Sequence, residues 1–98
     1  MSYSIRLAMA SDVPRLYEMA VAHYQASGYL FPVDEQYGLR FLHQQVQSPD
    51  ACALVLLRED KAVGVLLGSS SPHPFLPVKI AVEILWWVDE DHRGWDSL

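Results

Sequence analysis

The segment KIAVEILWWV, residues Lys79–Val88, is the feature of this sequence that most limits how the chain can fold. It is dense in β-branched and aromatic residues, a composition that is typical of strands. The sequence therefore predicts a strand over residues 79–88. The charged segment DEDHRG follows at once and predicts a turn.

Two helices are expected in the first half of the chain. Helical spacing of apolar residues predicts the first helix at about residues 12–26. Ser11 and Asp12 supply capping oxygens for it, Pro14 suits its first turn, and Gly28 ends the run. A second helix opens at its cap, Asp34, and ends at Ser48–Pro49.

Three further strands are expected. Alternating apolar residues predict a short strand at Ser4–Ala8. Two apolar runs, Ala51–Leu57 and Ala62–Gly68, predict an antiparallel pair of strands joined by a charged turn, REDK, at residues 58–61. The segment SSSPHPFLP, residues 69–77, contains three serines and three prolines, so we expect an exposed loop without regular structure.

Composition restricts the class of protein. The 98 residues, half of them apolar, suit one soluble domain spanning 1–98. Cys52, the only cysteine, lies in the apolar run ACALVLL, which suggests a buried strand thiol and favours a reducing, cytoplasmic setting. The net charge of −5 and the scattered basic residues disfavour nucleic-acid binding. No histidine or cysteine spacing predicts a metal site, and no segment predicts a membrane span.

The expected order of strand, two helices and three strands is an α+β arrangement with a mixed, largely antiparallel sheet. With IRLAMASDVPRLYEM at its start and AVEILWWVDEDHRG near its end, the chain resembles the N-terminal half of the GCN5-related N-acetyltransferase (GNAT) superfamily, which has the acyl-CoA N-acyltransferase fold. Ile5-Arg6-x-Ala8 with Asp12, and Val88 followed by an acidic turn and Arg93-Gly94, carry the resemblance. It implies acetyl transfer from acetyl-CoA to an amine.

The resemblance also implies where acetyl-CoA binds. Trp87 and Val88 correspond to the strand end that pairs with the pantetheine arm, and Arg93 and Gly94 to the start of the pyrophosphate turn. A turn that leads into a helix presents free N–H groups, and an arginine adds a charge-assisted contact. The loop between the two helices, with Tyr29 and Phe31, is expected to shape the amine-binding site.

Glu83 is the candidate catalytic residue. Strict alternation places Glu83, Leu85 and Trp87 on one face of the strand, and Val82, Ile84, Trp86 and Val88 on the other. The resemblance implies that Glu83 is the general base, a role that burial of a carboxylate favours. The alternatives are that Glu83 pairs with Arg6 or Arg40, or lies on a solvated face of the sheet.

The last residues depart from the family pattern. Asp96 and Leu98 stand where the phosphate-binding turn of the family has glycines, and the usual following helix and strand would lie after Leu98. The strand at 79–88 would then be an edge that favours self-association or a protein partner. We expect little acetyl-CoA binding by the chain alone. The alternative function is a shortened, catalytically inactive module that binds a protein partner as an inhibitor or regulator.

Overall fold

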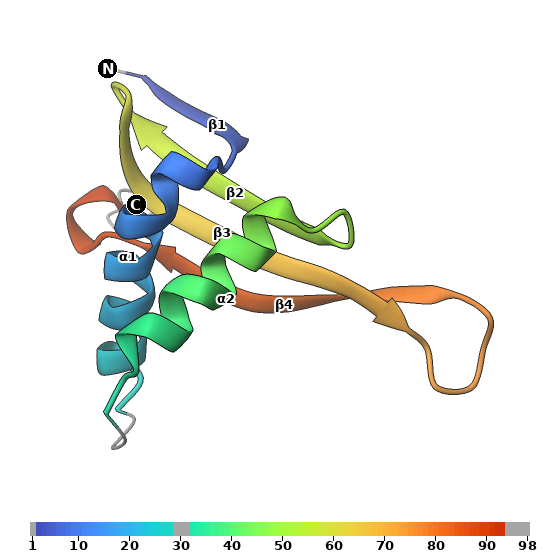
Figure 1. Ribbon diagram of the computed structural model, residues 1–98. Helices are drawn as coiled ribbons and strands as arrows, with labels where there is room; N and C mark the ends of the chain where they lie inside the picture. Colours follow the sequence, from blue (N-terminus) through green and yellow to red (C-terminus); the bar gives the residue numbers. More distant parts are fainter. Residues whose placement is uncertain (1, 29–31, 94–98) are drawn as a thin grey trace.

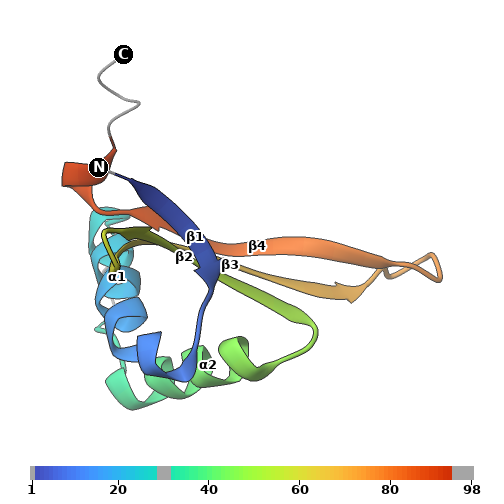
Figure 2. The same cartoon turned by 90° about the horizontal axis from the view of Figure 1, so that it is seen from above.

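The computed structural model describes residues 2–28 and 32–93 (Figure 1). Its elements follow the predicted order: β1 (Tyr3–Leu7), a 3-10 turn (Ala10–Asp12), α1 (Val13–Ala26), α2 (Glu35–Gln47), β2 (Ala51–Arg58), β3 (Lys61–Pro72), β4 (Lys79–Val88) and a second 3-10 turn (Glu90–His92). The four strands form one antiparallel sheet in the order β1-β2-β3-β4. Both helices cover the same face of this sheet, and the other face is open (Figures 1 and 2). The α+β prediction is confirmed.

The helices begin where the sequence places them, but only one of the two predicted caps is observed. The Asp34 carboxylate accepts a hydrogen bond from the Tyr37 amide at 3.0 Å and caps α2. Asp12 does not cap α1. Its carboxylate instead accepts from the Met9 amide at 2.7 Å and from both terminal nitrogens of Arg6, at 2.7 and 3.0 Å. The hydrogen bond from Arg6 lowers the pKa of Asp12. Within the described part of the chain, neither helix has the length and apolar character needed to cross a bilayer.

The turn between β2 and β3 is tighter than the four charged residues suggest. Arg58 and Lys61 are paired as the last residues of the two strands, so only Glu59 and Asp60 form the loop. Both have positive φ, 51° and 71°. Two successive residues with positive φ are the geometry of a type I′ turn, whose twist matches that of the flanking strands.

The segment expected to be irregular is partly a strand, which corrects that prediction. β3 continues to Pro72, and Ser69, Ser70, Ser71 and Pro72 pair with Val82, Ala81, Ile80 and Lys79. Serines and a terminal proline are accepted because β4 is long enough to supply a backbone partner for each of them. Beyond Ala51, where β2 begins, β3 and β4 form a two-stranded arm that projects past the helices (Figures 1 and 2).

The core lies between the helices and one face of the sheet. It is built from Val13, Leu16, Met19 and Leu42 on the helices and Ala53, Val55, Leu57, Val65 and Leu67 on the strands. Cys52 alternates with these strand residues and is exposed, so the predicted burial of its thiol is wrong. The opposite, open face carries a row of apolar side chains across all four strands: Leu7, Leu54, Leu66 and Trp86.

Candidate active site along β4

The end of β4 brings together the predicted cofactor-binding residues that the structure describes. Trp87, Val88 and Arg93, with Trp86, line a cavity of about 270 Å³. The guanidinium carbon of Arg93 lies 4.4 Å from the centroid of the Trp87 ring, and its Nε donates to the Val88 carbonyl at 2.6 Å. Gly94, the fourth predicted residue, lies outside the described residues. The turn after β4 therefore folds back so that one cation sits over the strand end.

A polar network holds this strand end against α1. Asp89 forms an ion pair with Arg15 of α1 and accepts from Nε1 of Trp87 at 3.1 Å. Arg15 also donates from Nε to the Ala62 carbonyl of β3 at 3.1 Å. His23 of α1 meets the Trp87 ring edge-on, with ring centroids 6.0 Å apart. The orientation of Trp87 is thus fixed from two sides, by a hydrogen bond to its nitrogen and by packing on its ring.

β4 contains a bulge that changes the predicted faces of the strand. Leu67 is opposite Leu85, but Gly68 is opposite Glu83, so Ile84 is an additional residue on β4. Ile84 and Leu85 both line a cavity under the helices. Glu83 lies in the cross-strand row of Gly68 and Cys52, and directly paired residues share a face. Glu83 is therefore on the open face, and its predicted grouping with Leu85 and Trp87 is wrong.

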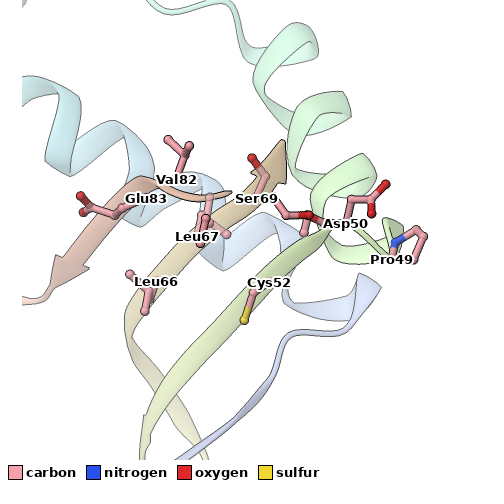
Figure 3. Close-up of a pocket in the computed structure, with 12 residues that line it drawn as sticks. Pro49, Asp50, Cys52, Leu66, Leu67, Ser69, Val82 and Glu83 are labelled. Atoms are coloured by element: carbon pink, nitrogen blue, oxygen red, sulfur yellow. The ribbon is translucent and has the colours of Figure 1, made fainter. Parts of the chain in front are cut away.

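The surroundings of Glu83 are a broad, open depression. Glu83 is exposed and lines a cavity of about 560 Å³ with Cys52, Leu66 and Ser70. Figure 3 shows Cys52 and Leu66 extending to one side of the sheet and Val82 to the other. Within the described residues Glu83 has no ion-pair partner, and Arg6, one predicted partner, is bound to Asp12. Glu83 thus lies on a solvated face of the sheet, which is one of the two alternatives to burial given above.

The predicted amine-binding loop is described only in part. Tyr29 and Phe31 lie outside the described residues. Pro32 and Val33, which follow them, line a cavity of about 320 Å³ between α1, α2 and the bulge of β4. Along β4, residues 81–83 line the depression at Glu83, residues 84–85 line this cavity on the helix-covered face, and residues 86–88 line the pocket at Arg93.

The network of Arg15 and Asp89 and the cavity between the helices are not predicted by the sequence. The Arg15–Asp89 pair joins residues that are 74 positions apart, so no local pattern indicates it. One feature of the sequence could have indicated the cavity. Gly38 is an isolated glycine in the middle of a predicted helix, where a glycine usually has a packing reason.

The outer edge of β4 and the cation at its end are the two features of this site that an extended anionic ligand could use. Among the described residues β4 has a strand partner on one side only, so its outer edge offers backbone groups to an extended ligand arm. Arg93 lines the pocket at the C-terminal end of β4, and its terminal nitrogens are suited to phosphate oxygens. Asp89, the first acidic residue of the turn, is neutralised by Arg15.

No protein-family model and no curated protein matches this sequence. Solved structures do match its fold. A predicted acetyltransferase from Clostridium acetobutylicum, solved with acetyl-CoA, has a TM-score of 0.82 at 10% identity, with 95% of this chain and 64% of that chain covered. A ribosomal-protein-alanine N-acetyltransferase from Brucella melitensis biovar Abortus 2308 has a TM-score of 0.70 at 19% identity, with 96% and 61% covered.

A GNAT family acetyltransferase from Staphylococcus aureus is also similar, with a TM-score of 0.68, 22% identity, and 95% of this chain and 67% of that chain covered. The chain thus spans about 60 to 70% of the length of these proteins. At these identities the likeness is one of fold. The chain has a part of the GNAT acetyltransferase fold, and the predicted resemblance is confirmed at that level.

Proposed function

We propose that this chain is the donor-binding part of an acetyl-CoA-dependent N-acetyltransferase. The observation that carries the proposal is the grouping of Trp87, Val88 and Arg93 around one pocket at the end of β4, beside an outer strand edge. The structural relatives support it, because they are acetyltransferases and one was solved with acetyl-CoA. A cytoplasmic location fits this proposal.

Acetyl-CoA supplies an acetyl group as a thioester. In the overall reaction the amine nitrogen forms a bond to the carbonyl carbon, the C–S bond breaks, and the amine proton leaves while the coenzyme departs as a thiol. The outer edge of β4 would hold the extended arm by backbone hydrogen bonds, and its N–H groups would stabilise negative charge on the carbonyl oxygen. Arg93 would contact the phosphate end.

Glu83 is proposed to accept the amine proton through water. Its exposed carboxylate lies on the open face, next to the bulge, whereas Ile84 and Leu85 face the cavity under the helices. Direct contact with an amine in that cavity would need the carboxylate to reach around the strand, so an intervening water suits the geometry better. In this proposal Glu83 accepts the proton but does not contact the bound amine directly.

The test is an assay of thiol release from acetyl-CoA with a panel of amines, using the polypeptide translated from the complete reading frame. Amine-dependent release of coenzyme A, with the acetylated amine identified by mass spectrometry, is the expected result. A Kd for acetyl-CoA below about 1 mM, without acetyl transfer to any amine of the panel, would contradict the enzymatic proposal.

A second candidate function is a binding module without catalysis, which acts on a protein partner as an inhibitor or regulator or associates with a second copy. The exposed apolar row on the open face favours it, since Leu7 is 67% and Trp86 60% exposed. The outer edge of β4 would then pair with the partner. No acetyl-CoA binding by the complete polypeptide, together with partner binding that Trp86→Ala removes, would support this function over the first.

A further inference from the structure

The cavity between α1, α2 and the bulge of β4 has the size and lining of a small-molecule site. Its volume of about 320 Å³ lies within the usual range for such sites, roughly 300–1,000 Å³. Leu42 and Leu67, which are almost fully buried, belong to its floor. The rings of three tyrosines and of Phe41 contribute to its walls. An apolar or aromatic group is the complementary occupant.

One wall of this cavity depends on a glycine inside a helix. A Cβ atom at Gly38 of α2 would lie 2.9 Å from a ring carbon of Tyr17, which is closer than carbon atoms pack. Glycine costs a helix roughly 1 kcal/mol relative to alanine. In return it lets the Tyr17 ring lie against the backbone of α2, where it lines the cavity instead of filling it.

The other wall depends on the bulge in β4. Without the additional residue, Ile84 and Leu85 would point to opposite faces of the sheet. With it, both side chains line the cavity. The occupant therefore lies directly against the segment of β4 whose outer edge is proposed to hold the acetyl donor.

The charge carried by the described residues that line the cavity is negative. Asp34, which is exposed, is a carboxylate among the described lining residues, and those residues include no lysine, arginine or histidine. One carboxylate oxygen of Asp34 accepts from the Tyr37 amide at 3.0 Å, and no described residue donates to the other oxygen. The faces of the tyrosine rings also attract cations.

We propose that this cavity binds a small primary amine with an aromatic or branched aliphatic body, whose ammonium group contacts Asp34. This inference rests on the proposed function, in which such an amine is the acetyl acceptor. Polyhydroxylated amines fit poorly, because the apolar floor would leave their hydroxyl groups without partners. Amino acids fit poorly because their carboxylate would lie near Asp34 with no cation to pair with it.

Calorimetric titration of the 98-residue chain with three related probes tests the proposal without acetyl-CoA. Phenethylamine carries the ring and the ammonium, phenethyl alcohol lacks the charge, and phenylalanine adds a carboxylate. Phenethylamine should bind about tenfold more tightly than either of the others, the effect expected of one charge-assisted contact. Equal binding of the amine and the alcohol, or no amine binding, would overturn the proposal.

Three variants locate the site. Asp34→Asn keeps a good helix cap but removes the charge, and should weaken phenethylamine binding about tenfold. Glu35→Gln removes the neighbouring carboxylate of α2, which does not line the cavity, and should have no effect. Gly38→Ala should leave the chain folded, as judged by circular dichroism, but displace Tyr17 and weaken binding. Equal affinities for the Asp34 and Glu35 variants would overturn the assignment of Asp34.

The two proposals fail separately. If the amine binds through Asp34 but the complete polypeptide acetylates no amine, the proposed function falls and the cation-binding cavity stands. If the complete polypeptide acetylates other amines and phenethylamine does not bind, the enzymatic function stands and the substrate class proposed here is wrong.

Discussion

Arg93 lies over the ring of Trp87, 4.4 Å from its centroid, and donates to the carbonyl of Val88, the last residue of β4. The cation is thus held at the strand end by two contacts before any ligand arrives. A preorganised cation loses less conformational entropy when it binds an anion than a free side chain does.

Replacing Arg93 should therefore weaken acetyl-CoA binding. In the polypeptide translated from the complete reading frame, Arg93→Ala should raise the Kd for acetyl-CoA about tenfold or more, because a charge-assisted contact is lost. Arg93→Lys keeps the charge but not the planar stacking, so its Kd for acetyl-CoA should lie between those of the parent and of Arg93→Ala. Arg40→Ala removes an exposed positive charge on α2 and serves as the control. Equal calorimetric affinities for the Arg93 and Arg40 variants would exclude a role for Arg93.

The role of Glu83 predicts a loss of rate without a loss of donor affinity. Glu83→Gln should lower kcat about a hundredfold, the size typical of a general base, while the Kd for acetyl-CoA stays unchanged. The loss should be smaller at high pH, where more of the amine is already deprotonated. Glu18→Gln, an exposed carboxylate on α1, is the matched control. Unchanged turnover in Glu83→Gln would remove this residue from the mechanism.

The Arg6–Asp12 pair predicts a pH dependence of stability. The pKa of Asp12 is lowered from 3.8, chiefly by the hydrogen bond from Arg6, so the pair stabilises the fold above that value. The contribution is lost as the pH falls through the lower pKa of the folded state. Asp12→Asn should thus reduce the free energy of unfolding at pH 7, and its difference from the parent should shrink in acid. Urea titrations from pH 7 to about 3 measure this.

Arg6→Gln provides the companion measurement. It removes the donor of the same hydrogen bond, so the parent and this variant should also converge in acid. A constant difference between the parent and Asp12→Asn at every pH would mean that the charge of Asp12 does not contribute.

A substitution in the β2–β3 turn should raise the stability of the fold. Glu59 has a φ of 51°, a conformation that costs an ordinary side chain free energy and costs glycine little. Glu59→Gly should raise the free energy of unfolding by about 0.5–1 kcal/mol, after the greater flexibility of glycine in the unfolded chain is included. Glu59→Ala keeps the strain and should not stabilise. Equal stabilities for the glycine and alanine variants would show that the turn is not strained.

The two faces of the sheet should respond differently to the loss of a leucine. Leu16 is 0% exposed on the helix-covered side, and Leu7 is 67% exposed on the open side. In denaturant titrations of the 98-residue chain, Leu16→Ala should cost about 2–5 kcal/mol and Leu7→Ala less than about 1 kcal/mol. A large cost for Leu7→Ala that grows with protein concentration would mean that the open face is covered by a second copy.

The order of elements could be predicted because its signals are local. Apolar periodicity, the Asp34 cap and the run from Lys79 to Val88 are each contained in one short stretch, and the bounds of β4 were predicted to the residue. The extension of β3 to Pro72 could not be predicted, because serines and proline enter a strand only when a partner is already aligned with them.

The arrangement of the candidate site was harder to predict, since it depends on register. One additional residue in β4, Ile84, reverses the face of Glu83 relative to Leu85, and nothing in the sequence of β4 alone marks it. The apolar neighbours of Cys52 predict a buried thiol, but alternation along β2 turns the side chain outward. The grouping of Trp87, Val88 and Arg93 was implied by the resemblance of this segment to the GNAT superfamily, and the three residues lie close together in the sequence.

The two-stranded arm formed by the far ends of β3 and β4 gives this small protein a gradient of local stability along a single strand. Near Leu67 and Leu85 the ladder is covered by helices and shared with β2, so its amides should exchange with solvent only when the whole domain unfolds. Near Ser71 and Ile80 the ladder has, among the described residues, neither helix cover nor a third strand, and it is held to Asp50 by the Lys79 ion pair and by the hydrogen bond from the Ser70 amide. Amides there should exchange through brief separations of the hairpin, orders of magnitude sooner. The same β4 would thus be rigid where chemistry is proposed and open to rearrangement a few residues away.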